Sequence, residues 1–506
     1  MRKQDFALEV QELLKLYAAH PQVTALDTLL KNDTSRNIFL KGLNGSGPAM
    51  TIASLFTKGR GSYVCVLNDQ EEAGYFYHDL MQLTASDEVY FFPSAYRRAI
   101  KYGHVDPANE ILRTEVLSRL QDPDASFVIV TYPDALAERV VAREVLKENT
   151  LKISVGEKLD NMFVSDVLDE YGFEQVDYVY EPGQYALRGS ILDVFSFSNE
   201  FPYRIDFFGD EVETIRTFDV ETQLSKEKLD SIYIVPEMSK NTKDSTSLLG
   251  SLPRNTCIAA RDLAWCKERI GSVWNDDPVV ADEESFADID QMRKKLVRGE
   301  DFLREVLDFR RIHFGARPMG TADATIHFST QTQPIYHKNF DRVSESFHKY
   351  LDEGYTLYIL SDQEKQANRI RMIFEDRGDN IPFTAGNRTI HEGFADDTLR
   401  ICFFTDHQLF DRFHKFNLKS DKARSGKITL SLKELNQFSQ GDYIVHIDHG
   451  VGQFGGLVRT EVNGKMQEAI KLIYQNNDII FVSIHSLHKL SKYKGKESGE
   501  PPKLSK

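Results

Sequence analysis

The chain has 506 residues and a formal net charge of −15, with 41% hydrophobic and 27% charged residues. This length predicts roughly three to four domains, and the composition is typical of globular proteins with substantial cores. The acidic balance argues against a surface that binds nucleic acid throughout, because neutralising phosphates needs clustered Lys and Arg. Any DNA contact is therefore expected to be local or to come from another part of the protein.

Cysteine usage and hydropathy point to the cytoplasm. The four cysteines are widely spaced, and Cys65 and Cys402 lie inside apolar runs, so we expect neither a disulfide framework nor a zinc site. The first 17 residues have apolar positions at helical spacing interrupted by charges, which is unlike a signal peptide. No run approaches the roughly 20 apolar residues of a membrane span, so no membrane contact is expected.

Residues 1–150 alternate strand and helix signals, which predicts a parallel sheet covered by helices. Short apolar runs at 37–43, 62–68 and 126–132 have strand length. Between the last two, Asp106 is a good N-cap and Pro107 suits the first helical position. We therefore predict an α/β domain here.

A phosphate-binding loop is present in outline after the first of these strands. Gly42 and Gly47 have the spacing of such a loop, which also contains Gly45 and whose backbone amides and following helix would cradle phosphate. Pro48 stands where the motif needs Lys, and Ala49 stands where it needs Ser or Thr to hold Mg²⁺. The loop is thus predicted to be degenerate: it retains the architecture without catalysis, and this chain should need no cofactor.

The pattern changes at about residue 151 to aromatic and β-branched residues alternating with polar ones, which predicts antiparallel strands in a module spanning 151–236. Gly209-Asp210 is a hairpin signal. In the strand 203–208, alternation places Tyr203, Ile205 and Phe207 on one face and Arg204, Asp206 and Phe208 on the other. From the residues alone, Phe208 is either an exposed interface residue or is covered by another element.

The remaining chain divides into segments of different character. Residues 237–324 give mixed signals without an assignable topology, and 325–416 read as a small α/β module of unknown role. Residues 417–437 are polar and basic, which suits a linker. Residues 438–506 are rich in strand signals, with Asn463-Gly464 as a hairpin turn, and predict a small β-barrel.

The stretch from Glu181 to Leu224 resembles the UvrA-binding domain that transcription-repair coupling factors of the Mfd family share with the excision-repair protein UvrB. The resemblance covers a long run of arginines, glycines and aromatics in matching order. It implies that Arg188, Arg204 and Phe208 belong to a surface that docks on UvrA. An aromatic side chain beside an Arg on an exposed sheet face is also the composition of an interface hot spot.

A second resemblance covers residues 441–474, whose core is HGVGQFGGL. This stretch looks like the RNA-polymerase-interacting domain that Mfd shares with CarD-type regulators, which implies a Tudor-like barrel that contacts the RNA polymerase β subunit. The contacting edge would comprise Leu457, Val458, Arg459, Thr460, Glu461 and Val462. His446, Asp448 and His449 lie where a strand runs into a glycine turn, and we expect no metal there.

Taken together, the chain resembles the amino-terminal part of the Mfd family, faintly from 240 to 320. The resemblance implies a UvrB-like α/β domain (1–150 and 237–324), an inserted α+β UvrA-binding module, a third α/β module and a CarD-like barrel. The function implied is that of an adaptor, with ATP, Mg²⁺ and most DNA contact belonging to a motor beyond this fragment. The run 91–110 is too short for the DNA-clamping hairpin of UvrB. The alternatives are a UvrB-like excision-repair subunit and a CarD-like regulator.

Overall fold

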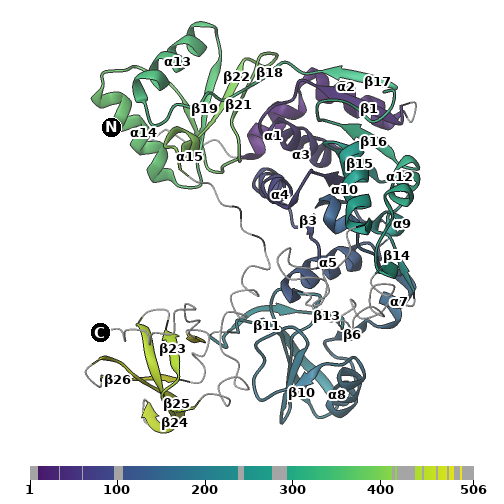
Figure 1. Ribbon diagram of the computed structural model, residues 1–506, viewed down its shortest axis with the longest axis vertical. Coiled ribbons are helices and arrows are strands. Elements are labelled where there is room, and N and C mark those ends of the chain that lie inside the picture. Colours follow the sequence, from purple (N-terminus) through teal and green to yellow (C-terminus); the bar gives the residue numbers. More distant parts are fainter. Residues whose placement is uncertain are drawn as a thin grey trace. The chain divides into compact units, whose positions relative to one another are not determined.

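The computed structural model describes residues 10–32, 35–59, 61–95, 106–122, 124–220, 222–236, 244–275, 293–412, 416, 418, 439–446, 449–462, 465–475, 478–483 and 490–492 (Figure 1). The chain is a multi-domain α/β protein that separates into two compact units. One unit joins Met1–Glu148 to Ser239–Leu418, and the other contains Asn149–Met238 and Lys419–Lys506. Within the described ranges, no helix has the length and apolar character to span a membrane.

The first unit is built on a seven-stranded sheet in which every neighbouring pair is parallel. Its strand order is β17-β1-β16-β15-β2-β4-β3. Strands β2 and β4 are buried along their whole length, as expected for a parallel sheet covered on both faces. The strands are β1 (Asn37–Lys41), β2 (Ser62–Val66), β3 (Val89–Phe92), β4 (Phe127–Thr131), β15 (Cys257–Ala260), β16 (Arg310–His313) and β17 (Ala324–His327).

Helices cover this sheet, and the one predicted from the sequence starts at the expected residue. The Asp106 side chain accepts a hydrogen bond from the Ala108 amide at 3.1 Å, and Pro107 occupies the first helical position of α5. The helices are α1 (Val10–Ala18), α2 (Pro21–Lys31), α3 (Gly47–Gly59), α4 (Gln70–Thr84), α5 (Pro107–Arg119), α6 (Pro133–Leu136), α7 (Arg143–Glu148), α9 (Leu248–Ser251), α10 (Leu263–Asn275) and α12 (Gly299–Leu307). A short pair, β5 (Val140–Val141) and β14 (Ser245–Thr246), lies outside the main sheet.

The segment whose topology the sequence left open completes the same sheet. Strand β15 lies between β2 and β16, so strands far apart in the sequence become neighbours. Strand β17 also joins this sheet, pairing Ile38 of β1 with Ala324. The predicted third module began at residue 325, and this boundary was wrong for 325–327, which belong to β17. The residues of a short strand do not indicate which sheet the strand will join.

The third module has a mixed five-stranded sheet of order β18-β21-β22-β19-β20, with β19 parallel to β20 and β22 and antiparallel pairing at β21. Its helices pack on this sheet through a core that includes Val343, Phe347, Ile370 and Phe404. The elements are β18 (Thr330–Thr332), α13 (Phe340–Asp352), β19 (Thr356–Leu360), α14 (Glu364–Asp376), β20 (Thr384–Gly386), β21 (Phe394–Asp396), β22 (Ile401–Thr405) and α15 (Asp406–Leu409).

The module that begins near residue 150 contains a six-stranded sheet of order β12-β11-β10-β9-β8-β7. Strands β8 to β12 pair antiparallel with their sequence neighbours, which confirms the predicted meander. Strand β7 departs from it, because it pairs parallel with β8. Helix α8 (Asn161–Glu170) covers one face through Val164 and Leu168. The strands are β7 (Glu174–Gln175), β8 (Gln184–Arg188), β9 (Ile191–Val194), β10 (Tyr203–Phe208), β11 (Glu211–Phe218) and β12 (Ser225–Leu229), beside a separate pair, β6 (Leu151–Ser154) and β13 (Ser231–Ile234).

The C-terminal segment forms a small antiparallel sheet of order β26-β25-β24-β23-β27. Its core includes Ile444, Ile470 and Leu472. The predicted turn at 463–464 lies outside the described residues, but the flanking Val462 and Lys465 pair directly, so β24 and β25 form a hairpin. The predicted linker lies almost entirely outside them. The strands are β23 (Tyr443–His446), β24 (Gly450–Val462), β25 (Lys465–Ile473), β26 (Ile479–Ser483) and β27 (Leu490–Lys492).

Candidate protein-docking sites

Strand β10 alternates between a buried and an open face as its sequence predicts. Tyr203, Ile205 and Phe207 are buried, whereas Arg204 and Asp206 are half-buried. Phe208 is 78% exposed at the end of the strand, directly before Gly209, whose φ of +66° forms the hairpin turn. The face assignment is therefore confirmed, and a large aromatic side chain projects into solvent from a well-defined turn.

The open face of this sheet carries an ion-pair network centred on Asp193 of β9, a residue that the sequence reasoning missed. The Asp193 carboxylate is fully buried and accepts hydrogen bonds from Arg204 Nε at 2.7 Å and Nη2 at 2.9 Å. Arg188 also pairs with this carboxylate. Because an unpaired buried charge is costly, Asp193 fixes the positions of both arginines. The sequence signal for this network was an Asp in the otherwise apolar strand β9, followed by a strand that contains an Arg.

Arg204 is more constrained than the expected exposed anchor. Its guanidinium lies 4.2 Å from the centre of the Phe218 ring, and Nη1 donates to the carbonyl oxygen of Gln223 at 3.2 Å. Only 15% of its side chain is exposed, so the expectation of an exposed Arg204 was wrong. The Asp193 carboxylate, the Gln223 carbonyl oxygen and the Phe218 ring all contact this guanidinium and so fix its position.

Arg188 is the more accessible of the two arginines, with 36% of its side chain exposed. Its Nη1 donates to the carbonyl oxygen of Asp177 at 2.8 Å, and the guanidinium lies 5.0 Å from the centre of the Tyr178 ring. The structure thus brings Arg188 and Arg204 together through one carboxylate. Phe208 lies further along the same face of β10.

Two further exposed apolar side chains begin α8. Met162 is 60% exposed and Phe163 is 52% exposed. The Leu159 amide donates to the carbonyl oxygen of Asp210 at 2.8 Å, which ties the start of α8 to the hairpin that follows Phe208. Exposed apolar residues that gather on one end of a module are typical of docking surfaces. Neither residue could be recognised as exposed from the sequence, because the exposure of a helix face depends on what packs against the helix.

In the C-terminal sheet, the predicted polymerase-contacting segment is half of a long strand. Strand β24 pairs with β23 through Gly450–Gln453, so over this part it is interior and not an edge. From Leu457 to Val462 it pairs with β25, and no other pairing is found for this half within the described residues. Leu457 is 43% exposed, whereas the side chains of Arg459, Thr460, Glu461 and Val462 lie outside the description, and Val458 is half-buried. The expected edge thus applies to the second half of β24 alone.

The sheet also has an apolar edge strand that the sequence reasoning missed. On β26, Ile479 is 46% exposed and Phe481 is 51% exposed, while Val482 points into the core. Near the other end of the sheet, the rings of His446 and His449 lie 4.6 Å apart, and Asp448 is outside the described residues. No cluster of three or more potential metal ligands occurs in the part of the chain that the structure describes.

The segment predicted to be a degenerate phosphate loop connects β1 to α3. Gly42 and Gly45 have φ values of +89° and +54°. Pro48 and Ala49 are buried in the first turn of α3, where neither offers a charge or a ligand oxygen. The amides of Asn44 and Ser46 donate to Thr330 Oγ1 at 2.8 Å and to the carbonyl oxygen of Glu392 at 3.0 Å. These loop amides therefore bond to the third module.

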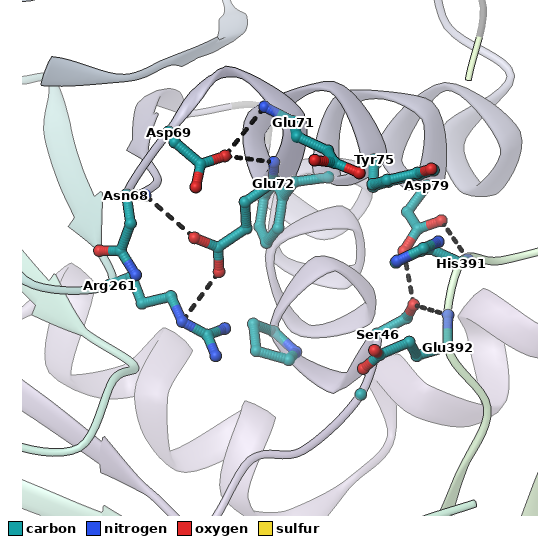
Figure 2. A pocket seen from close by; sticks show the side chains of 13 residues that line it. Ser46, Asn68, Asp69, Glu71, Glu72, Tyr75, Asp79, Arg261, His391 and Glu392 are labelled. Carbon is teal, nitrogen blue, oxygen red and sulfur yellow. Dashed lines mark hydrogen bonds and ion pairs between the residues drawn. The ribbon is translucent and has the colours of Figure 1, made fainter. Parts of the chain in front are cut away.

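A cavity of about 440 Å³ lies beside the loop, and its lining is acidic (Figure 2). Arg261 pairs with Glu72 at 2.8 Å, which leaves the other carboxylates in excess. Burial raises the pKa of Asp79 to about 7, and burial also raises that of Glu72. Such a lining disfavours the phosphates of a nucleotide. The acidic and basic residues around the cavity are Asp69, Glu71, Glu72, Asp79, Arg261, His391 and Glu392.

Two segments match known families. Residues 151–239 match the UvrB interaction domain, and residues 438–494 match the CarD-like/TRCF RID domain. Over 96% of its length the chain is 24% identical to a transcription-repair-coupling factor of Staphylococcus aureus. The chain is related to the transcription-repair-coupling factors. A coupling factor of Bacillus subtilis is 23% identical over 92% of the chain. The chain spans about half the length of these coupling factors, 48% and 46% respectively.

Proposed function

We propose that this chain acts as an adaptor in transcription-coupled nucleotide excision repair, binding RNA polymerase through its C-terminal sheet and recruiting UvrA through the module at 151–239. The observation that carries the proposal is the presence of both matched domains in one chain. A lone regulator or a lone excision-repair subunit needs only one of them. The adaptor must therefore bind two partners at separate surfaces.

The UvrA surface is the open face of the six-stranded sheet. Phe208 supplies an exposed aromatic anchor, and Arg188 supplies an accessible positive charge. Aromatic and Arg side chains dominate the binding energy of protein interfaces, because they bury large areas and make several directed contacts. Asp193 supports the site from beneath by holding both arginines in place. A preformed surface of this kind loses little conformational entropy on binding.

The polymerase surface is the second half of β24, which among the described residues pairs with β25 alone. A strand of the β subunit would pair with its other edge. Such β-augmentation derives affinity from main-chain hydrogen bonds and specificity from alternate side chains. Leu457 and its neighbours through Val462 would supply those side chains. In this proposal the sheet corresponds to the Tudor-like fold of CarD-type domains, and the parallel-sheet domain corresponds to the first domain of UvrB.

We infer that this chain does not hydrolyse ATP. Its loop carries Pro48 and Ala49 in place of the Lys and Ser or Thr that nucleotide hydrolysis needs. The acidic cavity beside the loop supports the same conclusion. ATP-driven translocation on DNA, with Mg²⁺, would belong to a motor elsewhere in the whole protein, where it would displace a stalled polymerase.

Separate titrations of the purified chain with UvrA and with the isolated polymerase β subunit test the proposal. Micromolar or tighter binding is expected for both partners, corresponding to about −8 kcal/mol each. Phe208→Ala should weaken only the first interaction, and substitutions at Arg459 and Thr460 should weaken only the second. Binding of one partner alone would reduce the chain to a repair subunit or a transcription regulator.

A further inference from the structure

The glycines of the degenerate loop make room for protein backbone. A Cβ atom on Gly42 would lie 2.2 Å from the carbonyl oxygen of Phe328. One on Gly45 would lie 2.9 Å from the carbonyl oxygen of Gly393 and 3.1 Å from that of Glu392. Since real Cβ atoms do not approach backbone so closely, both positions require glycine for packing as well as for their positive φ. Gly42 packs against the residue that follows β17 of the first sheet, whereas Gly45 packs against the third module.

Ser46 and Glu392 are joined by a reciprocal pair of hydrogen bonds. The Ser46 amide donates to the Glu392 carbonyl oxygen at 3.0 Å, and the Glu392 amide donates to Ser46 Oγ at 3.0 Å. A carbonyl oxygen carries partial negative charge, so it can accept the hydrogen bonds that the loop amides would otherwise donate to a phosphate. An element of this chain therefore satisfies donors of the loop.

Asp79 of α4 fixes the same contact from the other side. Its carboxylate accepts from Ser46 Oγ at 2.5 Å and from the His391 amide at 2.6 Å, as Figure 2 shows. The His391 ring stacks on Tyr75 with ring centres 3.6 Å apart. The contact thus involves backbone and side chains of both the first domain and the third module, and Asp79 and Ser46 are buried.

We propose that residues 391–393, the plug, act as an internal ligand of the degenerate phosphate loop. The plug closes the nucleotide position and couples the third module, whose role the sequence left open, to the first domain. Loop and plug should therefore open together or not at all. Restoring Lys and Thr at positions 48 and 49 would not restore nucleotide binding, because the plug already occupies the loop.

Hydrogen exchange of the full chain, followed by mass spectrometry, tests this coupling. Ser46→Ala removes the hydroxyl that joins Asp79 to Glu392 without adding bulk. Exchange should become roughly tenfold faster in both segments 42–50 and 388–396, since a lost buried hydrogen bond raises local opening by about this factor. Strands β2 and β4 should keep their protection. This test is independent of UvrA and polymerase binding, so it cannot fail for the same reason as the adaptor proposal.

A glycine pair provides the matched steric comparison. A Cβ on Gly393 would lie 2.2 Å from Gln333 Oε1 and 2.3 Å from the Phe403 carbonyl oxygen, whereas one on Gly271 meets nothing within 4 Å. Gly393→Ala should accelerate exchange of loop and plug together, and Gly271→Ala should change neither. If Gly393→Ala does not fold, Ser46→Ala decides the matter. Acceleration in only one of the two segments would overturn the proposal, as would Mg²⁺-dependent binding of a fluorescent ATP analogue to the unmodified chain.

Discussion

Arg204 and Asp193 form a two-bond ion pair across β10 and β9, with N–O distances of 2.7 and 2.9 Å and a carboxylate that has no exposed surface. This pair distinguishes two kinds of residue on the proposed UvrA-binding face. Arg204 stabilises the sheet in addition to any contact with a partner, whereas Phe208 projects from the sheet into solvent. Substitutions at the two positions should therefore have different consequences for folding.

Phe208→Ala should weaken UvrA binding by fivefold or more, because truncating an interface anchor commonly costs about 1 kcal/mol or more. The melting temperature should stay within a degree or two, since the side chain is 78% exposed. Calorimetric titration with parallel thermal melts measures both quantities. Ile335→Ala, which truncates another exposed apolar side chain in the third module, is the control and should leave UvrA affinity unchanged. Unchanged affinity for the Phe208 variant would remove this residue from the interface.

Arg204→Ala should destabilise the module by about 2 kcal/mol or more, because it leaves the buried Asp193 carboxylate short of its bidentate partner. Arg188 remains beside that carboxylate and limits the loss. Urea unfolding of the variant, compared with the Phe208 variant, gives the measurement. The double variant with Asp193→Asn should recover part of the loss, since the uncompensated charge is then removed. Equal stability of Arg204→Ala and the parent chain would contradict the assigned network.

Replacing Arg459 by Glu together with Thr460 by Arg should weaken capture of the polymerase β subunit by tenfold or more. Both residues lie in the half of β24 that, within the described residues, pairs with β25 alone. The first substitution reverses a charge and the second inserts one. UvrA affinity should not change. The effect on capture of the β subunit should be compared with that of Phe481→Ser, a substitution on the edge strand β26. A larger effect at Phe481 would move the polymerase contact to that edge.

The buried carboxyl of Asp79 should make the stability of the first unit fall as the pH rises. Burial raises its pKa from 3.8 to about 7 in the folded chain, so the folded state retains the proton more tightly than the unfolded state. This contribution is fully present below pH 4, approximately, and is lost as the pH rises through about 7. The neighbouring charged groups are Glu392 and, when protonated, His391.

Asp79→Asn should reduce this pH dependence by about 1 kcal/mol or more between pH 5 and pH 8, since one pKa unit corresponds to about 1.4 kcal/mol. Urea unfolding at the two pH values, with Asp352→Asn as an exposed control, measures the difference. A variant whose stability changes with pH as steeply as that of the parent chain would show that Asp79 does not titrate in this range.

Local patterns predicted much of the secondary structure, but not the contacts between distant segments. The alternation in Tyr203–Phe208 is a property of six consecutive residues, so its faces could be assigned correctly. The bond between Ser46 and Glu392 joins residues 346 positions apart, for which no periodic signal exists. The pairing of Asp193 with Arg204 likewise depends on strand register, and the partly interior position of β24 depends on which strands lie beside it. The two domain matches could be predicted because both segments carry long, distinctive runs of residues.

The adaptor proposal depends most directly on simultaneous binding. In sedimentation velocity, a mixture of the chain with UvrA and the polymerase β subunit should give one faster species that contains all three, because the two surfaces belong to different domains. Phe208→Ala should lower the fraction of this ternary species and leave the complex with the β subunit intact. If the two partners instead compete, so that each displaces the other from the chain and no ternary species forms, the chain is not an adaptor.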